Sequence, residues 1–355
     1  MTKLEQRLSF PLGGFGLVFR GLALLMAIAP AALARDQVEL VGGKTIIGTI
    51  TRETPAEITI DTQTGIQTIA VNTIVEVRYE GQGAAMTQAK IHDQSGNFTA
   101  AMDQFTKAQN EIKDKPLIVA AARFGHARAQ ARLALEEAKG LDEAVRALES
   151  FRQAHSQSRY HYPLHELLGR LQFAKKDHAK AGAAFDELAK APWPETKLLA
   201  PLFHGRVLVA QNKPDQAIAR FDEVVAATGD SPELVRLRTD ALIDKAACLR
   251  VKNDRQQEIE TLEKAVELAP VGAVTVQGEA YTALGDALRA GGRPKDALVA
   301  FLHVELLFSK DKELRARALY NLSQLWDELG NPERANAARS TLERDHPDST
   351  WKKKL

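Results

Sequence analysis

One short pattern recurs along the chain and narrows what the chain can fold into. A Leu-Gly or other small-residue pair is followed about a dozen residues later by Ala-x-x-x-Phe. The clearest copies are Leu168-Gly169 with Ala181 and Phe185, Gly205 with Ala217 and Phe221, and Leu284-Gly285 with Ala297 and Phe301. Small residues are needed where two helices cross closely, because a large side chain would hold the backbones apart. The pattern predicts stacked helical hairpins, which build a binding surface rather than a catalytic pocket.

The second helix of each predicted hairpin is anchored by a residue that returns at spacings of 43, 37, 36, 41, 39 and 38 residues. The anchors are Ala101, Ala144, Ala181, Ala217, Glu258, Ala297 and Ala335. They resemble tetratricopeptide repeats, a family with a period of about 34 residues. The resemblance implies a mainly α solenoid of six to seven hairpins within residues 82–355. Glu258 departs from the expected alanine, and Arg339 replaces the aromatic residue of the last repeat, as in a capping repeat.

Residues 35–81 have a different texture, rich in isoleucine, valine and threonine at a period of two. Gly42-Gly43 and Thr64-Gly65 are turn signals between these runs. Five short strands predict a small barrel or strongly bent sheet, and the segment resembles SH3-like and Sm-like barrels. Tyr79 is the only aromatic residue between 36 and 80, so the aromatic groove of a peptide-binding SH3 domain is absent. We therefore expect an accessory or self-associating role for this module.

The first 34 residues read as an export signal. Lys3, Arg7 and Arg20 are basic, residues 21–31 are apolar, and Ala32-Leu33-Ala34 offers a signal-peptidase site with cleavage after Ala34. The alternative is an uncleaved membrane anchor. The apolar run is shorter than the roughly 20 residues that span a bilayer. We predict an exported protein, periplasmic or otherwise extracytoplasmic, with no membrane span after cleavage.

Composition argues against nucleic-acid binding and against cysteine chemistry. Without residues 1–34 the chain carries 44 basic and 45 acidic residues, which gives no electrostatic footprint for nucleic acid. Cys248 is the only cysteine, so no internal disulfide is possible, and its surroundings predict a buried hydrophobe rather than a reactive thiol.

No catalytic, cofactor or metal site is predicted from motifs. Residues 165–169 begin like a zinc-protease helix, but Gly169 stands where the second histidine belongs. His161 and His165 are a possible metal pair, yet no third ligand follows in the sequence, and a packed or solvated role is favoured. Gly42-Gly43-Lys44-Thr45 lacks the earlier glycine and the following helix of a phosphate loop.

Because the motifs predict no catalytic, cofactor or metal site, the remaining candidate function is the binding of a partner. In tetratricopeptide proteins the first helix of each hairpin lines a concave groove. The resemblance therefore implies that a partner contacts the exposed face of each first helix. The corresponding residues are Glu166, Arg170, Leu202, Arg206, Ile243, Arg250, Asp286, Arg289, Arg317, Tyr320 and Gln324. The five arginines would form a ladder suited to carboxylates or acidic peptides. The alternative, favoured for charges on helix surfaces, is that they pair with neighbouring acids of the chain.

Two functional hypotheses follow. The first is an exported, non-enzymatic scaffold that binds a protein or peptide partner in the groove of the solenoid. The second is a structural component of an envelope assembly that self-associates through the β module or the ends of the stack. An enzyme would require a polar constellation that the sequence does not offer.

Overall fold

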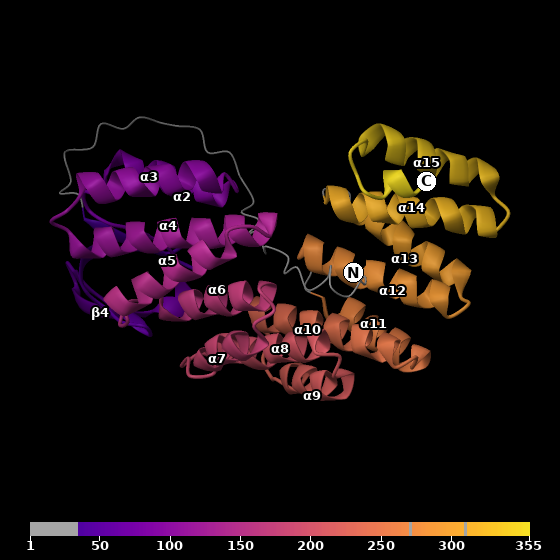
Figure 1. The fold of residues 1–355 in the computed structure, drawn as a ribbon, viewed down its shortest axis with the longest axis horizontal. Helices are drawn as coiled ribbons and strands as arrows, with labels where there is room; N and C mark the ends of the chain where they lie inside the picture. Colours follow the sequence, from indigo (N-terminus) through magenta and orange to yellow (C-terminus); the bar gives the residue numbers. More distant parts are fainter. Residues whose placement is uncertain (1–34, 270–271, 309–310) are drawn as a thin grey trace. The chain divides into compact units, whose positions relative to one another are not determined.

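The computed structural model describes residues 35–269, 272–308 and 311–355 (Figure 1). The predicted signal peptide, residues 1–34, lies outside the described residues. The described chain divides into two compact units, one ending at Lys197 and the other running from Leu198 to Leu355. No helix of the described ranges is both long and apolar enough to cross a membrane.

The strand-rich module predicted at residues 35–81 forms one five-stranded antiparallel sheet in the order β4-β3-β2-β1-β5. Its elements are β1 (Asp36–Leu40), β2 (Thr45–Glu53), β3 (Glu57–Thr62), β4 (Gly65–Ala70), the 3₁₀ turn η1 (Val71–Thr73) and β5 (Ile74–Arg78). Ile46 and Ile50 on β2 and Ile58 and Ile60 on β3 face the core, because alternate residues of a strand point to the same side. The SH3-like identity of this sheet stays a prediction.

Fourteen helices of the described residues form seven hairpins. They are α2 (Gly83–Gln94), α3 (Phe98–Glu111), α4 (Pro116–Glu137), α5 (Leu141–Ala154), α6 (His161–Ala174), α7 (His178–Leu188), α8 (Pro194–Ala210), α9 (Pro214–Val225), α10 (Pro232–Val251), α11 (Arg255–Leu268), α12 (Val274–Ala290), α13 (Pro294–Leu307), α14 (Lys312–Glu328) and α15 (Pro332–Asp345). The predicted hairpin fold is confirmed.

The second helix of most hairpins begins with an N-capping side chain, with a proline at the first helical position, or with both. Asn97, Asp177, Asp254 and Asn331 each accept a hydrogen bond from the backbone N–H three residues later, which satisfies one of the free donors of the first turn. Proline takes the first helical position of α9, α13 and α15, where its missing N–H removes no helical bond. Each of the four capping Asn and Asp residues lies four positions before the anchor of its repeat. The turn and the anchor therefore keep a constant spacing from one repeat to the next.

Glycine lets the two helices of a hairpin approach. A Cβ atom on Gly169 of α6 would lie 2.2 Å from the Phe185 ring of α7, and one on Gly205 of α8 would lie 2.4 Å from Phe221 of α9. Both rings are fully buried. The predicted pairing of a small residue with a phenylalanine is thus a direct contact. Gly125 of α4 makes the same contact with Phe105, which lies on the preceding helix α3.

The sheet shares its core with the first hairpins. Buried side chains of β1–β5 and of α2–α6 form one hydrophobic cluster. A buried polar group also joins them: the hydroxyl of Tyr79 donates to Glu53 Oε1 at 2.5 Å, and Arg159, just before α6, lies 3.3 Å from the same oxygen. Lys90 of α2 donates to the Val77 carbonyl at 2.6 Å. The sheet therefore packs against several hairpins at once.

Candidate binding surfaces

All five arginines of the predicted ladder are ion-paired within the chain. Arg170 pairs with Glu166 at 3.2 Å, Arg206 with Asp244 at 2.7 Å, Arg250 with Glu258 at 2.7 Å, Arg289 with Glu328 at 3.4 Å, and Arg317 with Asp286. The structure thus has the arrangement that the sequence left open as an alternative. A partner that used these guanidinium groups would have to share or displace an internal carboxylate.

In the second unit, three of these pairs connect first helices of successive hairpins. Arg206 of α8 reaches α10, while Arg289 of α12 and Arg317 of α14 join those two helices. Although burial lowers the pKa of Arg206, the neighbouring Asp244 and Asp240 carboxylates raise it more. Burial raises the pKa of Asp240 to about 6, against the opposing effect of Arg236 and Arg206. The first helices of the second unit therefore carry a partly desolvated network of positively and negatively charged side chains.

Two of the predicted contact residues are not available to a partner. Leu202 of α8 and Ile243 of α10 are only 1% and 5% exposed. Both pack into hydrophobic clusters between helices. The prediction is wrong for these two residues because α8 and α10 are covered on more than one side, so the phase assumed to be exposed meets a neighbouring helix.

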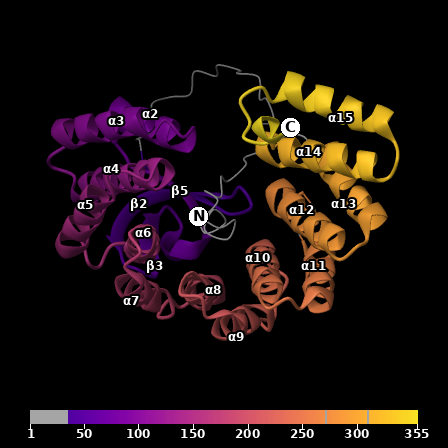
Figure 2. The ribbon, with the colours of Figure 1, turned by 45° about the vertical axis from the view of Figure 1, so that its right-hand side comes forward.

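Tyr320 and Gln324 lie half-buried on α14, and the end of the chain packs onto this helix. The Trp351 ring lies 5.5 Å from the Tyr320 ring, and the Arg317 guanidinium lies 5.5 Å from the centre of the indole. The indole N–H donates to Glu313 Oε1 at 2.8 Å. Figure 2 shows the C-terminus beside α14. We call residues 347–355 the C-terminal segment; it occupies part of the predicted partner face, which the sequence did not reveal.

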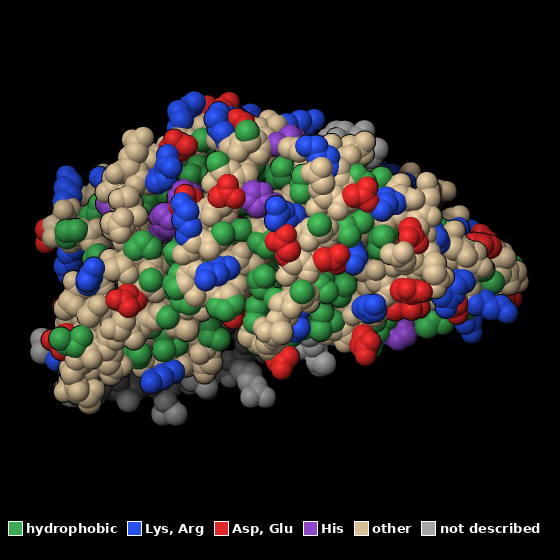
Figure 3. Space-filling view, turned by 90° about the horizontal axis from the view of Figure 1, so that it is seen from below, with side chains coloured by type: hydrophobic (Ala, Val, Ile, Leu, Met, Phe, Trp, Pro, Cys, Tyr) green, Lys and Arg blue, Asp and Glu red, His purple; other side chains and the backbone are tan. Residues whose placement is uncertain are grey.

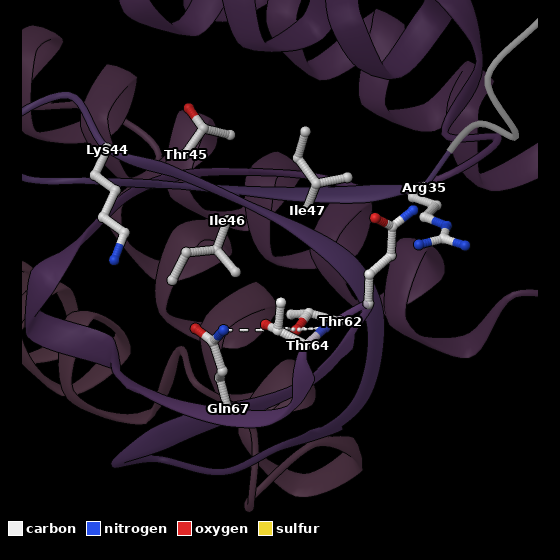
Figure 4. A pocket seen from close by; sticks show the side chains of 9 residues that line it. Arg35, Lys44, Thr45, Ile46, Ile47, Thr62, Thr64 and Gln67 are labelled. Atoms are coloured by element: carbon white, nitrogen blue, oxygen red, sulfur yellow. Dashed lines mark hydrogen bonds between the residues drawn. The ribbon is translucent and has the colours of Figure 1, made fainter.

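A shallow hollow of about 520 Å³ lies on the β module. Figure 4 shows Lys44 and Arg35 on opposite sides of it, with Gln67 and the Thr62–Thr64 turn along one edge. The Gln67 side chain donates to the Thr62 hydroxyl at 3.5 Å. The mixed lining and open form fit contact with another macromolecule better than enclosure of a small ligand.

A histidine cluster lies in the hairpin of α6 and α7. His161 Nε2 is 3.8 Å from Glu187 Oε2, and the rings of His161 and His165 are 4.7 Å apart. Burial lowers the pKa of His165 to about 4, helped by His161, and burial also lowers the pKa of His161. Burial therefore favours the neutral form of both imidazoles. Glu187 could not be predicted as a member of this cluster from the sequence, because only the packing of α7 on α6 brings it beside the histidines.

Charges of both signs are interspersed on the one face of the molecule that Figure 3 draws. On the face in Figure 3, Lys and Arg side chains alternate with Asp and Glu, and apolar side chains surface between them. This distribution matches the near-zero net charge and offers no extended single-signed surface on that face.

Comparison with known proteins supports the repeat assignment. A tetratricopeptide repeat family model matches residues 204–273. The crystal structure of the apo form of RapI is 12% identical, with a TM-score of 0.55 over 76% of this chain and 77% of that chain. A tetratricopeptide repeat protein from Parabacteroides merdae is 14% identical, with a TM-score of 0.49 over 76% of this chain and 95% of that chain. A search of curated proteins finds no match.

The repeat anchors and the glycine–phenylalanine contacts agree with the family-model match and with the likeness in fold to RapI. Residues 204–273 match the tetratricopeptide repeat model, and the described chain has the tetratricopeptide-type helical-hairpin fold, preceded by an N-terminal five-stranded sheet.

Proposed function

We propose that the protein is an exported, non-enzymatic scaffold that binds a segment of a partner protein on the first-helix faces of its hairpins. The observation that carries this proposal is the C-terminal segment on α14. A short stretch of chain already lies on residues that the sequence singled out for partner contact, Arg317 and Tyr320. Export rests on the signal-like sequence of residues 1–34.

The contacts of the C-terminal segment indicate which peptides suit the face. Trp351 places an aromatic ring against Tyr320 and a guanidinium, while its N–H binds the Glu313 carboxylate. Trp, Tyr and Arg are the residue types that contribute most to protein interfaces, since they combine large contact areas with directional polar groups. A partner segment with an aromatic residue beside basic residues would match this face.

Removal of residues 347–355 tests whether α14 is a peptide-binding face. The probe is a labelled synthetic peptide of those nine residues, followed by fluorescence anisotropy. The truncated protein should bind it at least about tenfold more tightly than the full chain, in which the intramolecular segment competes at high effective concentration. Full-length Trp351→Ala should also gain binding, because its own segment is held less firmly.

Two controls define the site. Tyr320→Ala in the truncated protein should lose most of the gain, and a peptide with Trp351→Ala should bind neither protein. Circular dichroism must show that each variant keeps its helices. Equal binding by the full and truncated proteins would remove α14 from the proposed surface.

Exposed apolar side chains favour the second candidate, self-association through the β module. Val41, Ile47, Ile66 and Val75 are 70%, 53%, 74% and 49% exposed. Ile66 lies on β4, an edge strand of the sheet, and unpaired edges readily add another strand.

The test is the mass of the protein measured by sedimentation equilibrium over a wide range of concentrations. If the β module mediates association, Ile66→Lys should weaken it by about tenfold or more, because a charge would enter the apolar contact. Val251→Lys, at an exposed position of the second unit, should leave it unchanged. A monomer at every concentration would eliminate this candidate.

A further inference from the structure

The α6–α7 hairpin brings together three side chains with the donor atoms of a metal site. Among the described residues, His161, His165 and Glu187 are the group whose candidate ligand atoms all lie within 4.8 Å of one another. The two histidines are one turn apart and share a face of α6, as residues at i and i+4 do. Glu187 approaches from the end of α7.

The polar groups of the cluster point to a ligand. His165 is 94% buried, and its Nδ1 atom has no hydrogen-bond partner. A buried polar atom without a partner is uncommon, because it has lost its hydrogen bonds to water without a replacement. Lone pairs on neutral imidazole nitrogens bind metal ions, so an ion bound through Nδ1 would give this atom a partner.

Glu187 is already oriented for such a role. Lys190 Nζ donates to Glu187 Oε1 at 2.6 Å, which leaves Oε2 on the side of His161. Hydrogen bonds that hold a ligand's second atom are typical of metal sites, where they fix ligand direction. The Lys190 charge opposes a cation nearby, but its side chain is 66% exposed and therefore well screened.

We propose that His161, His165 and Glu187 bind a divalent first-row transition-metal ion, with zinc as the best match. Two imidazole nitrogens and one carboxylate oxygen are a ligand set used for Zn²⁺, and water would complete a tetrahedron. Mg²⁺ and Ca²⁺ prefer oxygen ligands alone, so they should not compete. In a tetrahedral site, ligand atoms about 2.1 Å from the ion lie roughly 3.4 Å apart. Small side-chain rotations would bring these three to that spacing.

Cobalt titration of the untagged protein tests the proposal. Co²⁺ adopts the same ligands and gives visible absorption bands whose intensity reports coordination. One Co²⁺ per chain should bind, with a Kd on the order of micromolar. Zn²⁺ should displace it, and Mg²⁺ should not. Zn²⁺ should also raise the Tm, since ligand binding to the folded state stabilises it.

Single variants assign the ligands. His161→Gln, His165→Gln and Glu187→Gln should each weaken Co²⁺ binding at least about tenfold. His178→Gln is the matched control, because His178 also lies on this hairpin and has an unpartnered buried Nδ1 but stands outside the cluster. It should bind Co²⁺ as the unmodified protein does. His161 and Glu187 are half-buried, so their variants keep the test valid if His165→Gln unfolds.

Two outcomes would overturn the proposal. One is the absence of stoichiometric Co²⁺ and Zn²⁺ binding by the folded protein. The other is a loss of binding in His178→Gln as large as in His161→Gln, which would assign the metal to another place.

Discussion

Gly169→Val should destabilise the first unit by about 3 kcal/mol, although valine is a slightly better helix former than glycine. The new side chain would enter the space of the Phe185 ring, which lies 2.2 Å from the position of a Cβ atom and is fully buried. Either the ring leaves its rotamer or α6 and α7 move apart. Urea unfolding followed by circular dichroism measures the loss, and amide exchange in α6 and α7 locates it.

The control for this prediction lies at the end of the same helix. Ala174→Val, at an exposed position, should cost only the difference in helix propensity, about 0.5 kcal/mol. Phe185→Leu combined with Gly169→Val should recover part of the loss, because a smaller side chain makes room. Equal stability of Gly169→Val and Ala174→Val would mean that the close contact of glycine and phenylalanine does not hold this hairpin together.

Removing both arginines around Glu258 should destabilise the second unit by about 3–5 kcal/mol. Glu258 is fully buried, and its carboxylate pairs with Arg250 at 2.7 Å and with Arg255. The Arg250→Ala, Arg255→Ala variant would leave a buried charge without a partner, which costs more than the pairs contribute. Urea unfolding of the full chain measures the change.

The third substitution makes this test specific. Adding Glu258→Ala, the residue expected at this anchor, removes the stranded charge and should return stability to within about 1 kcal/mol of the unmodified protein. Arg220→Ala, which breaks an exposed pair with Glu223, should change stability by about 0.5 kcal/mol or less. If the triple variant is as unstable as the double, the arginines stabilise through packing of their stems instead.

The repeat could be predicted because its signals are local. Small residues, a phenylalanine one turn later and Asn, Asp or Pro at the turn all act within one hairpin. Glu258 stood out as a departure, but its partners did not. Arg255 lies three residues away on the same helix, whereas Arg250 reaches Glu258 across the turn between α10 and α11.

The candidate sites depended on contacts that spacing does not encode. Whether Arg317 pairs with Asp286 depends on how closely α14 lies to α12. Glu187 comes beside the histidines only because α7 packs on α6. Leu202 was misplaced because the phase of a helix does not tell how many neighbours cover it. The C-terminal segment has no periodic pattern, so its position on α14 could not be predicted.

The sheet that shares a core with α2–α6 gives the two units different unfolding behaviour. Hairpins that touch only their neighbours can unravel one at a time from a free end. In the first unit, however, the sheet contacts several hairpins together, and Glu53 binds both Tyr79 and Arg159. Loss of one of these hairpins exposes the apolar face that the others share. The first unit should therefore open in a single step, whereas the second can fray progressively under load.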